Sequence, residues 1–375
     1  MSTAESPTPL KILIAPDSFK GTATSPQAAE YLADGVRSVE PDAEITLAPM
    51  ADGGEGSADT FSGHRITLPT TDAAGRLTEA TYVFDPETAT AYIDVAAASG
   101  LPAVAENPVP LHGDTYGTGV LVADAETRGA RRVVLCLGGS ATTDGGTGIL
   151  VALGAEPLSA EGLPIPKGGG GLINLGSIDT ARLNIRAAAL EFLLLTDVTS
   201  PAVGAEGAAQ TFGPQKGADA EQVRQLEAGI SRLCEVTGVD PQTPGTGAAG
   251  ALPVGLLWLS TLLHGNSDHI HLLPGAPLIA RSQDLEELIP QADLVITGEG
   301  RLDAQSFRGK VVGTLAGLVA DTPAVLGVAA GAVATAVPDG VLTAELPAHA
   351  DVAVQLREAG AQLVRDYRRM STVQG

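Results

Sequence analysis

A glycine-rich segment with several hydroxyl side chains follows a buried apolar run near the middle of the chain. Residues 137–148 read LGGSATTDGGTG and come directly after the run 133–136. Backbone N–H groups next to glycine, together with the start of a helix, can bind phosphate without any basic side chain. The segment therefore predicts a phosphate-binding loop, although it contains no lysine or arginine. A tight turn that serves only the path of the chain is the open alternative.

Residues 138–148 are called the Gly loop below, and its polar groups define the predicted chemistry. Backbone and hydroxyl groups would contact phosphate at Gly138, Gly139, Ser140, Thr142, Thr143, Gly145 and Gly146. Asp144 is the only carboxylate in the loop, and it could hold Mg²⁺ directly or through water. Capping of the helix predicted from Ile149 onward is the competing role for Asp144.

Basic side chains are rare in this chain, and a few of them lie in loops between apolar runs. The sequence holds 22 Lys and Arg against 44 Asp and Glu, a formal charge of −22. Lys20 lies in APDSFKG, Lys216 in FGPQKGA and Arg301 in GEGRLDAQSFRGK. A surface position is the simplest interpretation of any one of them. Together they could supply the positive charge that the Gly loop lacks.

Carboxylates recur directly after the apolar runs. Asp17 and Ser18 follow the first run, and Asp52 and Glu55 lie in MADGGEGS, where they could bind a cation or accept a hydroxyl proton. Asp197 in TDVTSP could accept a substrate hydroxyl proton during phosphoryl transfer, or coordinate Mg²⁺. Helix capping by Asp52 and an Asx turn at Asp197 are equally compatible with the local sequence.

Two further motifs favour structural roles. Residues 245–250 read GTGAAG, but no strand leads into them, so a dinucleotide-binding role lacks its context and a turn into a helix is favoured. The pair His269 and His271 could lie on one face of a strand, but no third metal ligand is evident. We therefore interpret both histidines as structural or surface residues.

Apolar runs bounded by Gly, Pro or Asp must position these loops. Their lack of polar alternation is typical of parallel strands that are buried on both faces. The predicted strands lie at 11–16, 44–50, 91–96, 131–139, 191–198, 292–300 and 324–331. Helices are predicted after an N-cap at Ser25, after Asp219, and over 351–370. The fold class is α/β, and its ligands are expected beyond the carboxyl ends of the strands.

Composition limits the number of domains, the kinds of partner and the location that we expect. A chain of 375 residues is long enough for two domains. Its acidic surface argues against nucleic acid and anionic membranes as partners. Cys136 and Cys234 are expected to be buried free thiols. Without a signal pattern or a span-length apolar segment, a soluble, cytoplasmic protein is expected.

The blocks APDSFKG, PMADGGEGS, TYGTG, GGSATTDGGTG, DVTSP, FGPQKGA, GTGAAG and DLVITGEGRLDAQSFRGK, taken in this order, resemble the glycerate kinase type-1 family. The resemblance extends from about Lys11 to beyond Gly331. Ser200 stands where the family usually has Asn, and Ser306 where it has Thr. Both differences keep a small polar side chain.

The resemblance implies ATP-dependent phosphorylation of D-glycerate, with 2-phosphoglycerate as product. Formation of 3-phosphoglycerate, or phosphorylation of a related sugar acid, remains an alternative. The resemblance also implies two domains with the active site in the cleft between them. One is a discontinuous flavodoxin-like parallel-sheet domain, residues 1–70 with 286–375, and the other is an inserted α/β domain, residues 71–285. The protein is expected to act as a monomer or homodimer.

Within this hypothesis each candidate residue has a role. Asp197 orients the substrate hydroxyl, and Lys20 and Lys216 contact the transferred phosphate or the substrate carboxylate. Substrate binding is assigned to Asp17, Ser18, Asp52, Glu55 and Arg301, and Mg²⁺ binding to Asp144, Glu299 and Asp303.

Two alternatives belong to other classes. A non-catalytic sensor of nucleotides or sugar acids would need the Gly loops but no converging carboxylates. An NAD-dependent dehydrogenase would need a glycine fingerprint led by a strand, which GTGAAG does not provide.

Overall fold

The protein is described by a computed structural model over residues 9–374, except residues 20, 305, 308, 309 and 350. Its contacts divide the chain into two compact units. Unit 1 consists of Met1–Asp52 and Pro274–Gly375, and unit 2 of Gly53–Leu273. Unit 1 is discontinuous: its first segment ends at residue 52 and its second begins at residue 274, whereas the sequence predicts 70 and 286.

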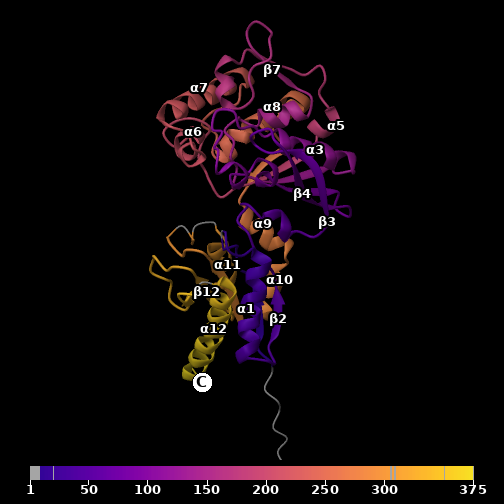
Figure 1. Cartoon of the computed structure of the whole chain (residues 1–375). Helices are drawn as coiled ribbons and strands as arrows, with labels where there is room; N and C mark the ends of the chain where they lie inside the picture. The colour runs from indigo at the N-terminus through magenta and orange to yellow at the C-terminus, as the bar shows by residue number, and fades with distance from the viewer. Residues whose placement is uncertain (1–8, 20, 305, 308–309, 350, 375) are drawn as a thin grey trace, which may run out of the picture. The chain divides into compact units, whose positions relative to one another are not determined.

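Unit 1 is built on one parallel sheet (Figure 1). The spatial order of its strands is β13-β12-β11-β1-β2. Counted in chain order within the unit, this is the flavodoxin-like order 2-1-3-4-5, so the expected fold class is confirmed. The strands are β1 (Lys11–Ile14), β2 (Glu44–Leu47), β11 (Leu294–Glu299), β12 (Val325–Ala330) and β13 (Leu342–Glu345).

The helices of unit 1 follow the strands along the chain. They are α1 (Ser25–Val39), α9 (Gly275–Ser282), α10 (Leu285–Leu288), the 3₁₀ helix η5 (Ile289–Gln291), α11 (Val311–Val319) and α12 (Val352–Gln374). Thr24, not Ser25, is the N-cap of α1, because its side chain accepts the N–H of Gln27. The hydroxyl of Ser25 instead donates to the carbonyl of Pro16. Helix α9 contacts α11, which explains why residues 274–285 belong to unit 1.

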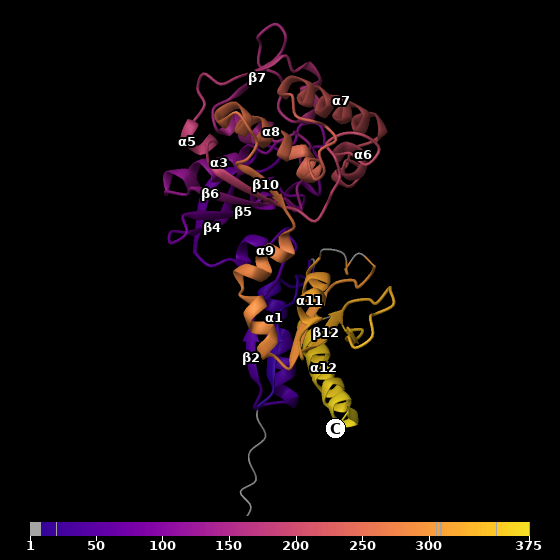
Figure 2. The ribbon, with the colours of Figure 1, turned by 180° about the vertical axis from the view of Figure 1, so that it is seen from behind.

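Helices α1 and α12 lie side by side and cover one apolar core of unit 1 (Figures 1 and 2). Glycines allow this close approach. A Cβ atom at Gly35 would overlap the carbonyl of Arg357, and one at Gly360 would overlap the carbonyl of Leu32. The two ends of the chain are therefore joined in one core.

Unit 2 contains a mixed six-stranded sheet in the order β10-β9-β6-β5-β4-β3. Strands β5, β6, β9 and β10 are parallel, and Figure 2 shows β4, β5 and β6 as neighbours. The antiparallel pair β3 and β4 extends this sheet at one edge. Because β3 is part of the unit 2 sheet, the segment that leads into it, from Gly53, also belongs to unit 2. The strands are β3 (His64–Thr71), β4 (Leu77–Asp85), β5 (Thr90–Asp94), β6 (Arg132–Cys136), β9 (Glu191–Leu195) and β10 (Ile270–Leu273), with a separate hairpin of β7 (Glu156–Leu158) and β8 (Ser177–Asp179).

The α-helices of unit 2 are α2 (Val95–Ser99), α3 (Tyr116–Thr127), α4 (Thr147–Ala152), α5 (Ile185–Ala188), α6 (Ala208–Phe212), α7 (Ala220–Thr237) and α8 (Ala248–His264). The 3₁₀ helices are η1 (Ser57–Thr60), η2 (Pro102–Val104), η3 (Gly169–Asn174) and η4 (Pro214–Lys216). Asp219 caps α7 as predicted, because its side chain accepts the N–H groups of Glu221 and Gln222.

All seven predicted strands are present, and their carboxyl ends gather polar loops. In unit 2 the last residues of three adjacent strands, Asp94, Cys136 and Leu195, are paired across the sheet. In unit 1 the N–H of Asp17, after β1, donates to the carbonyl of Gly298 in β11 at 2.9 Å. This pair of strands is the topological switch point, where such folds bind ligands. No helix among the described residues has the length and apolar composition needed to cross a membrane.

Candidate active site

The Gly loop begins at the carboxyl end of β6, in the middle of the parallel part of the unit 2 sheet. The N–H of Gly138 donates to the carbonyl of Gly53 at 3.2 Å, and the N–H of Leu137 donates to Leu195 at the end of β9. The loop MADGGEGS and the strand that leads to Asp197 are therefore its direct neighbours. These three polar segments were singled out separately in the sequence, and the fold brings them to one edge.

Close backbone contacts hold the Gly loop on several sides. A Cβ atom at Gly138 would lie 2.5 Å from the Cα atom of Gly54. At Gly250 and Gly169, a Cβ atom would overlap the carbonyl oxygens of Thr142 and Thr143. The glycines of this region therefore serve the close packing of the Gly loop against its neighbours.

Replacing Gly138 with alanine should disturb this packing. The added methyl group meets the backbone of Gly54, so we expect the free energy of unfolding to fall by about 1–3 kcal/mol. Denaturant unfolding of the Gly138→Ala variant measures this change. The matched control is Gly317→Ala in α11, where a Cβ atom meets nothing within 4 Å and no loss is expected. An equal effect at both positions would contradict the packing argument.

Several donors of the Gly loop are left for a ligand. The backbone N–H groups of Gly139, Ser140, Thr142, Thr143 and Asp144 have no acceptor among the residues that the structure describes. Four of these five residues are buried, and Gly139 is exposed. Backbone N–H groups in buried segments are rarely left without a partner, so these donors indicate an anion site. The hydroxyls of Thr142 and Thr143 are also buried and, within the described ranges, make no hydrogen bond.

Lys216 is the basic side chain that the fold brings to the Gly loop. It ends η4 and is 5% exposed. Its ammonium donates to the hydroxyl of Ser140 at 3.0 Å and to the carbonyl of Thr142 at 2.6 Å. Burial lowers the pKa of Lys216 to about 7, and the nearby charge of Asp144 opposes this shift. The predicted partnership between Lys216 and the Gly loop is therefore present in unit 2.

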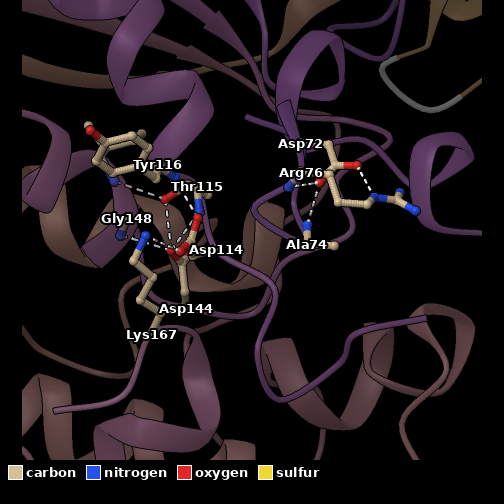
Figure 3. Close-up of polar contacts among 10 residues, drawn as sticks. Asp72, Ala74, Arg76, Asp114, Thr115, Tyr116, Asp144, Gly148 and Lys167 are labelled. Carbon is tan, nitrogen blue, oxygen red and sulfur yellow. Dashed lines mark hydrogen bonds and ion pairs between the residues drawn. The ribbon is translucent and has the colours of Figure 1, made fainter. Parts of the chain in front are cut away.

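Asp144 has a structural role in this geometry. One carboxylate oxygen accepts the N–H and hydroxyl of Thr115 and the N–H of Gly148 (Figure 3). The other oxygen accepts the N–H of Gly146. The side chain is completely buried. Because both oxygens already accept hydrogen bonds, the helix-capping alternative is favoured over direct binding of Mg²⁺. Binding of Mg²⁺ by Asp144 stays a prediction.

Asp197 lies two residues beyond β9 and is exposed. Its loop is tied to GTGAAG, because the N–H groups of Gly245 and Gly247 donate to Thr199 and Ser200. GTGAAG in turn enters α8, as the turn interpretation predicts. This motif therefore supports the loop of Asp197 on one side and the Gly loop on the other.

The segment MADGGEGS spans the boundary between the units, with Asp52 in unit 1 and Glu55 in unit 2. Glu55 lies beside Gly139, where a Cβ atom would approach the Glu55 side chain to 3.3 Å. The predicted substrate-binding role of Glu55 is therefore compatible with its place next to the Gly loop.

The unit 1 candidates gather at the carboxyl ends of β1, β2 and β11. Asp17 and Ser18 are half-buried in the loop after β1, next to Gly298. Asp52 follows β2 after a short segment. Lys20 lies outside the described residues. Asp17, beside Gly298, therefore lies at the switch point of the flavodoxin-like sheet, the position that the fold favours for a ligand.

Glu299 ends β11 and is the most strongly perturbed of these carboxylates. Burial raises its pKa, and the charges of Asp303 and Asp52 raise it further, against the hydrogen bond of Ser306 and the charge of Lys310. One of its carboxylate oxygens is buried and has no hydrogen-bond partner among the described residues. Arg301, in contrast, is 71% exposed and lies 4.0 Å from Asp303.

The carboxylates of unit 1 fit Mg²⁺ better than Asp144 of unit 2 does. This ion prefers oxygen ligands and is usually held by one or two carboxylates together with substrate phosphates. Glu299 offers a buried oxygen without a partner, and Asp303 is close enough to raise its pKa. No group of three or more potential metal ligands is found in the described part of the chain. The ion would therefore need phosphate oxygens to complete its coordination.

Two buried carboxylates of unit 2 were not singled out from the sequence. Asp94 ends β5, and burial raises its pKa to about 6. Burial and the nearby Asp144 raise the pKa of Asp114, also to about 6, and Lys167 lies 3.9 Å from it (Figure 3). Asp94 stands at a strand end, as Asp197 does, so the same rule could have identified it. Asp114 does not follow a predicted strand, so this rule would not have identified it.

The histidines near β10 make contacts within unit 2, and their interpretation as structural or surface residues stays a prediction. His269 stacks on His264 with ring centroids 3.7 Å apart, and His271 pairs with Glu191. Cys136 and Cys234 are buried free thiols, as predicted.

Comparison with known proteins identifies similar chains. The model of the glycerate kinase family matches residues 12–368. A glycerate kinase of Halalkalibacterium halodurans is 40% identical over 80% of this chain and 79% of its own length. A glycerate 2-kinase of Escherichia coli K12 is 38% identical over 80% of each chain. A solved structure named glycerate kinase 2, from Salmonella typhimurium LT2, has a TM-score of 0.82 and 32% identity, covering 98% of this chain and 100% of its own.

Proposed function

Because the chain belongs to the glycerate kinase family, we propose that it transfers the terminal phosphoryl group of ATP to D-glycerate and forms 2-phosphoglycerate. The family makes it a phosphotransferase that acts on a hydroxyl group. The observation that carries the proposal is the Lys216 ammonium, which is bound into the Gly loop beside five available N–H groups. This arrangement suits a phosphate group.

The reactants explain why such a site is needed in an acidic protein. ATP carries about four negative charges and glycerate one, so fixed donors and cations must balance the charge that shifts during transfer. In unit 2 the Gly loop would cradle a phosphate and Lys216 would contact the transferred group. Asp197 would accept or orient the proton of the substrate hydroxyl.

Unit 1 supplies the second set of groups. Glu299 and Asp303 would hold Mg²⁺, which neutralises phosphate charge when it is bound. The exposed guanidinium of Arg301 would bind the carboxylate of glycerate. Substrate binding is completed in this proposal by Lys20, Asp17, Ser18 and Asp52 of unit 1 and by Glu55 of unit 2.

Position 2 is proposed as the site of phosphorylation because a relative with 80% coverage is named a glycerate 2-kinase. Phosphorylation at position 3, or of a related sugar acid, is the alternative outcome of the test. The expected cleft site, the cytoplasmic location and the monomeric or dimeric state stay predictions.

The test measures ADP release by the purified protein with ATP, Mg²⁺ and either D-glycerate, L-glycerate or no acceptor. We expect ADP release that depends on D-glycerate, and a phosphomonoester at position 2 in the ³¹P NMR spectrum of the product. A signal for 3-phosphoglycerate would correct the position. Nucleotide binding without any acceptor-dependent ADP release would favour the sensor and overturn the proposal.

A further inference from the structure

The loop MADGGEGS is held in place by a carboxylate that no motif contains. Asp94, the last residue of β5, is 9% exposed. Its two oxygens accept the backbone N–H of Gly56 at 2.8 Å and of Ala58 at 2.9 Å. A carboxylate that accepts two N–H groups fixes the backbone that donates them.

This loop in turn fixes the start of the Gly loop. Gly53 accepts the N–H of Gly138, and Gly54 fills the space where a Cβ atom of Gly138 would lie. Glu55 lies against Gly139. A shift of residues 53–58 would therefore move both the Glu55 carboxylate and the first residues of the proposed phosphate site.

We propose that Asp94 is a positioning residue of the kinase reaction. In its ionised form it holds residues 53–58 against the Gly loop and keeps the Glu55 side chain next to Gly139. The inference rests on the proposed function of the Gly loop. Protonation removes an acceptor for one of the two N–H groups, so the loop loses part of its support.

The charged and titratable groups around Asp94 determine when this occurs. Burial raises its pKa to about 6, the hydrogen bonds from Ala58, Gly56 and Cys136 lower it, and the charge of Asp59 raises it. Asp59 in η1 also pairs with Arg65. Activity of the wild type should therefore fall as the pH decreases through about 6.

The principal test is the pH profile of kcat/KM for Asp94→Asn. An amide offers only one acceptor oxygen, so kcat/KM should fall by on the order of 10²-fold at pH 8, as expected when a reacting group is displaced. The variant should also lose the acidic limb of the profile, which is the decrease of kcat/KM as the pH falls through about 6. A wild-type profile in Asp94→Asn would overturn the inference. Absence of kinase activity in the wild type would instead overturn the proposed function.

The matched control is Asp72→Asn. Asp72 is a buried carboxylate that accepts the N–H groups of Ala74 and Arg76 and pairs with the Arg76 side chain, in the turn between β3 and β4 (Figure 3). Its replacement should lower stability but leave the acidic limb unchanged. If Asp72→Asn also removed the limb, the effect would be general and the inference would fail.

Asp59→Asn provides a second test that does not depend on the folding of Asp94→Asn. Asp59 is exposed, and removal of its charge should lower the pKa of Asp94. The acidic limb of kcat/KM should therefore move to lower pH while activity at pH 8 is retained. A limb that stays in place would show that Asp94 is not the group that titrates.

Discussion

Replacing Lys216 with methionine is expected to lower kcat/KM by about 10²–10³-fold, the usual cost of removing one preorganised donor from a transition state. Methionine keeps the length of the buried side chain but removes its charge and its donors. The Gly loop would then lose the basic side chain that donates to Ser140 and Thr142. Steady-state kinetics with D-glycerate and ATP measure the loss.

The stability of the wild type relative to Lys216→Met should depend on pH. Burial lowers the pKa of Lys216 to about 7, below its ordinary 10.5. The stability that this group contributes is therefore present above pH 10.5 and is lost as the pH falls through about 7. Relative to Lys216→Met, the wild type should become less stable between pH 10 and pH 6. Thermal unfolding across this range measures the difference.

The control for Lys216 is Lys167→Met, which removes a lysine of unit 2 that is 64% exposed. Activity and its pH dependence should be retained there. An active Lys216→Met variant, or a loss of equal size at Lys167, would show that the buried ammonium does not serve the reaction.

Replacing Asp197 with asparagine is expected to reduce kcat by about 10²–10⁴-fold, the range for a positioned acid or base. The side chain keeps its shape but can no longer accept the hydroxyl proton. Because Asp197 is assigned to the acceptor substrate, KM for ATP should change little. Steady-state kinetics with each substrate varied in turn separate these effects.

Asp179→Asn is the matched control, since Asp179 is also an exposed carboxylate at a strand end of unit 2, where it ends β8 and accepts the N–H of Ala181. It should leave both constants unchanged. A normal kcat in Asp197→Asn would remove Asp197 from the mechanism and leave proton acceptance to another group.

The sequence was most informative where burial alone determines structure. Runs such as Val133–Cys136 are apolar without alternation because parallel strands are covered on both faces, so their type and place were predictable. The edge pair β3 and β4 was missed because its exposure varies along the strands. The same pair shifted the domain boundary, since a strand belongs to the sheet that supplies its hydrogen bonds.

The candidate site was predictable as a set of loops but not in its internal contacts. Strand-end position identified Asp197 and could have identified Asp94. Burial of Lys216 depends on its contacts with Ser140 and Thr142, more than 70 residues away in the sequence. The hydrogen bonds from Thr115 to Asp144 are not predictable from the sequence, because the two residues are 29 positions apart and only the fold brings them together.

Proton uptake on ligand binding tests most directly whether Lys216 and the Gly loop form the phosphate site. Calorimetric titration at pH 8 in two buffers of different ionisation enthalpy counts the protons, with a non-hydrolysable ATP analogue plus Mg²⁺ and with 2-phosphoglycerate as separate ligands. At this pH the buried amine is mostly neutral, and a phosphate beside it should restore its charge. We predict that at least one ligand takes up close to one proton in the wild type and none in Lys216→Met. Equal proton uptake and equal affinity for both ligands in the two proteins would contradict the account.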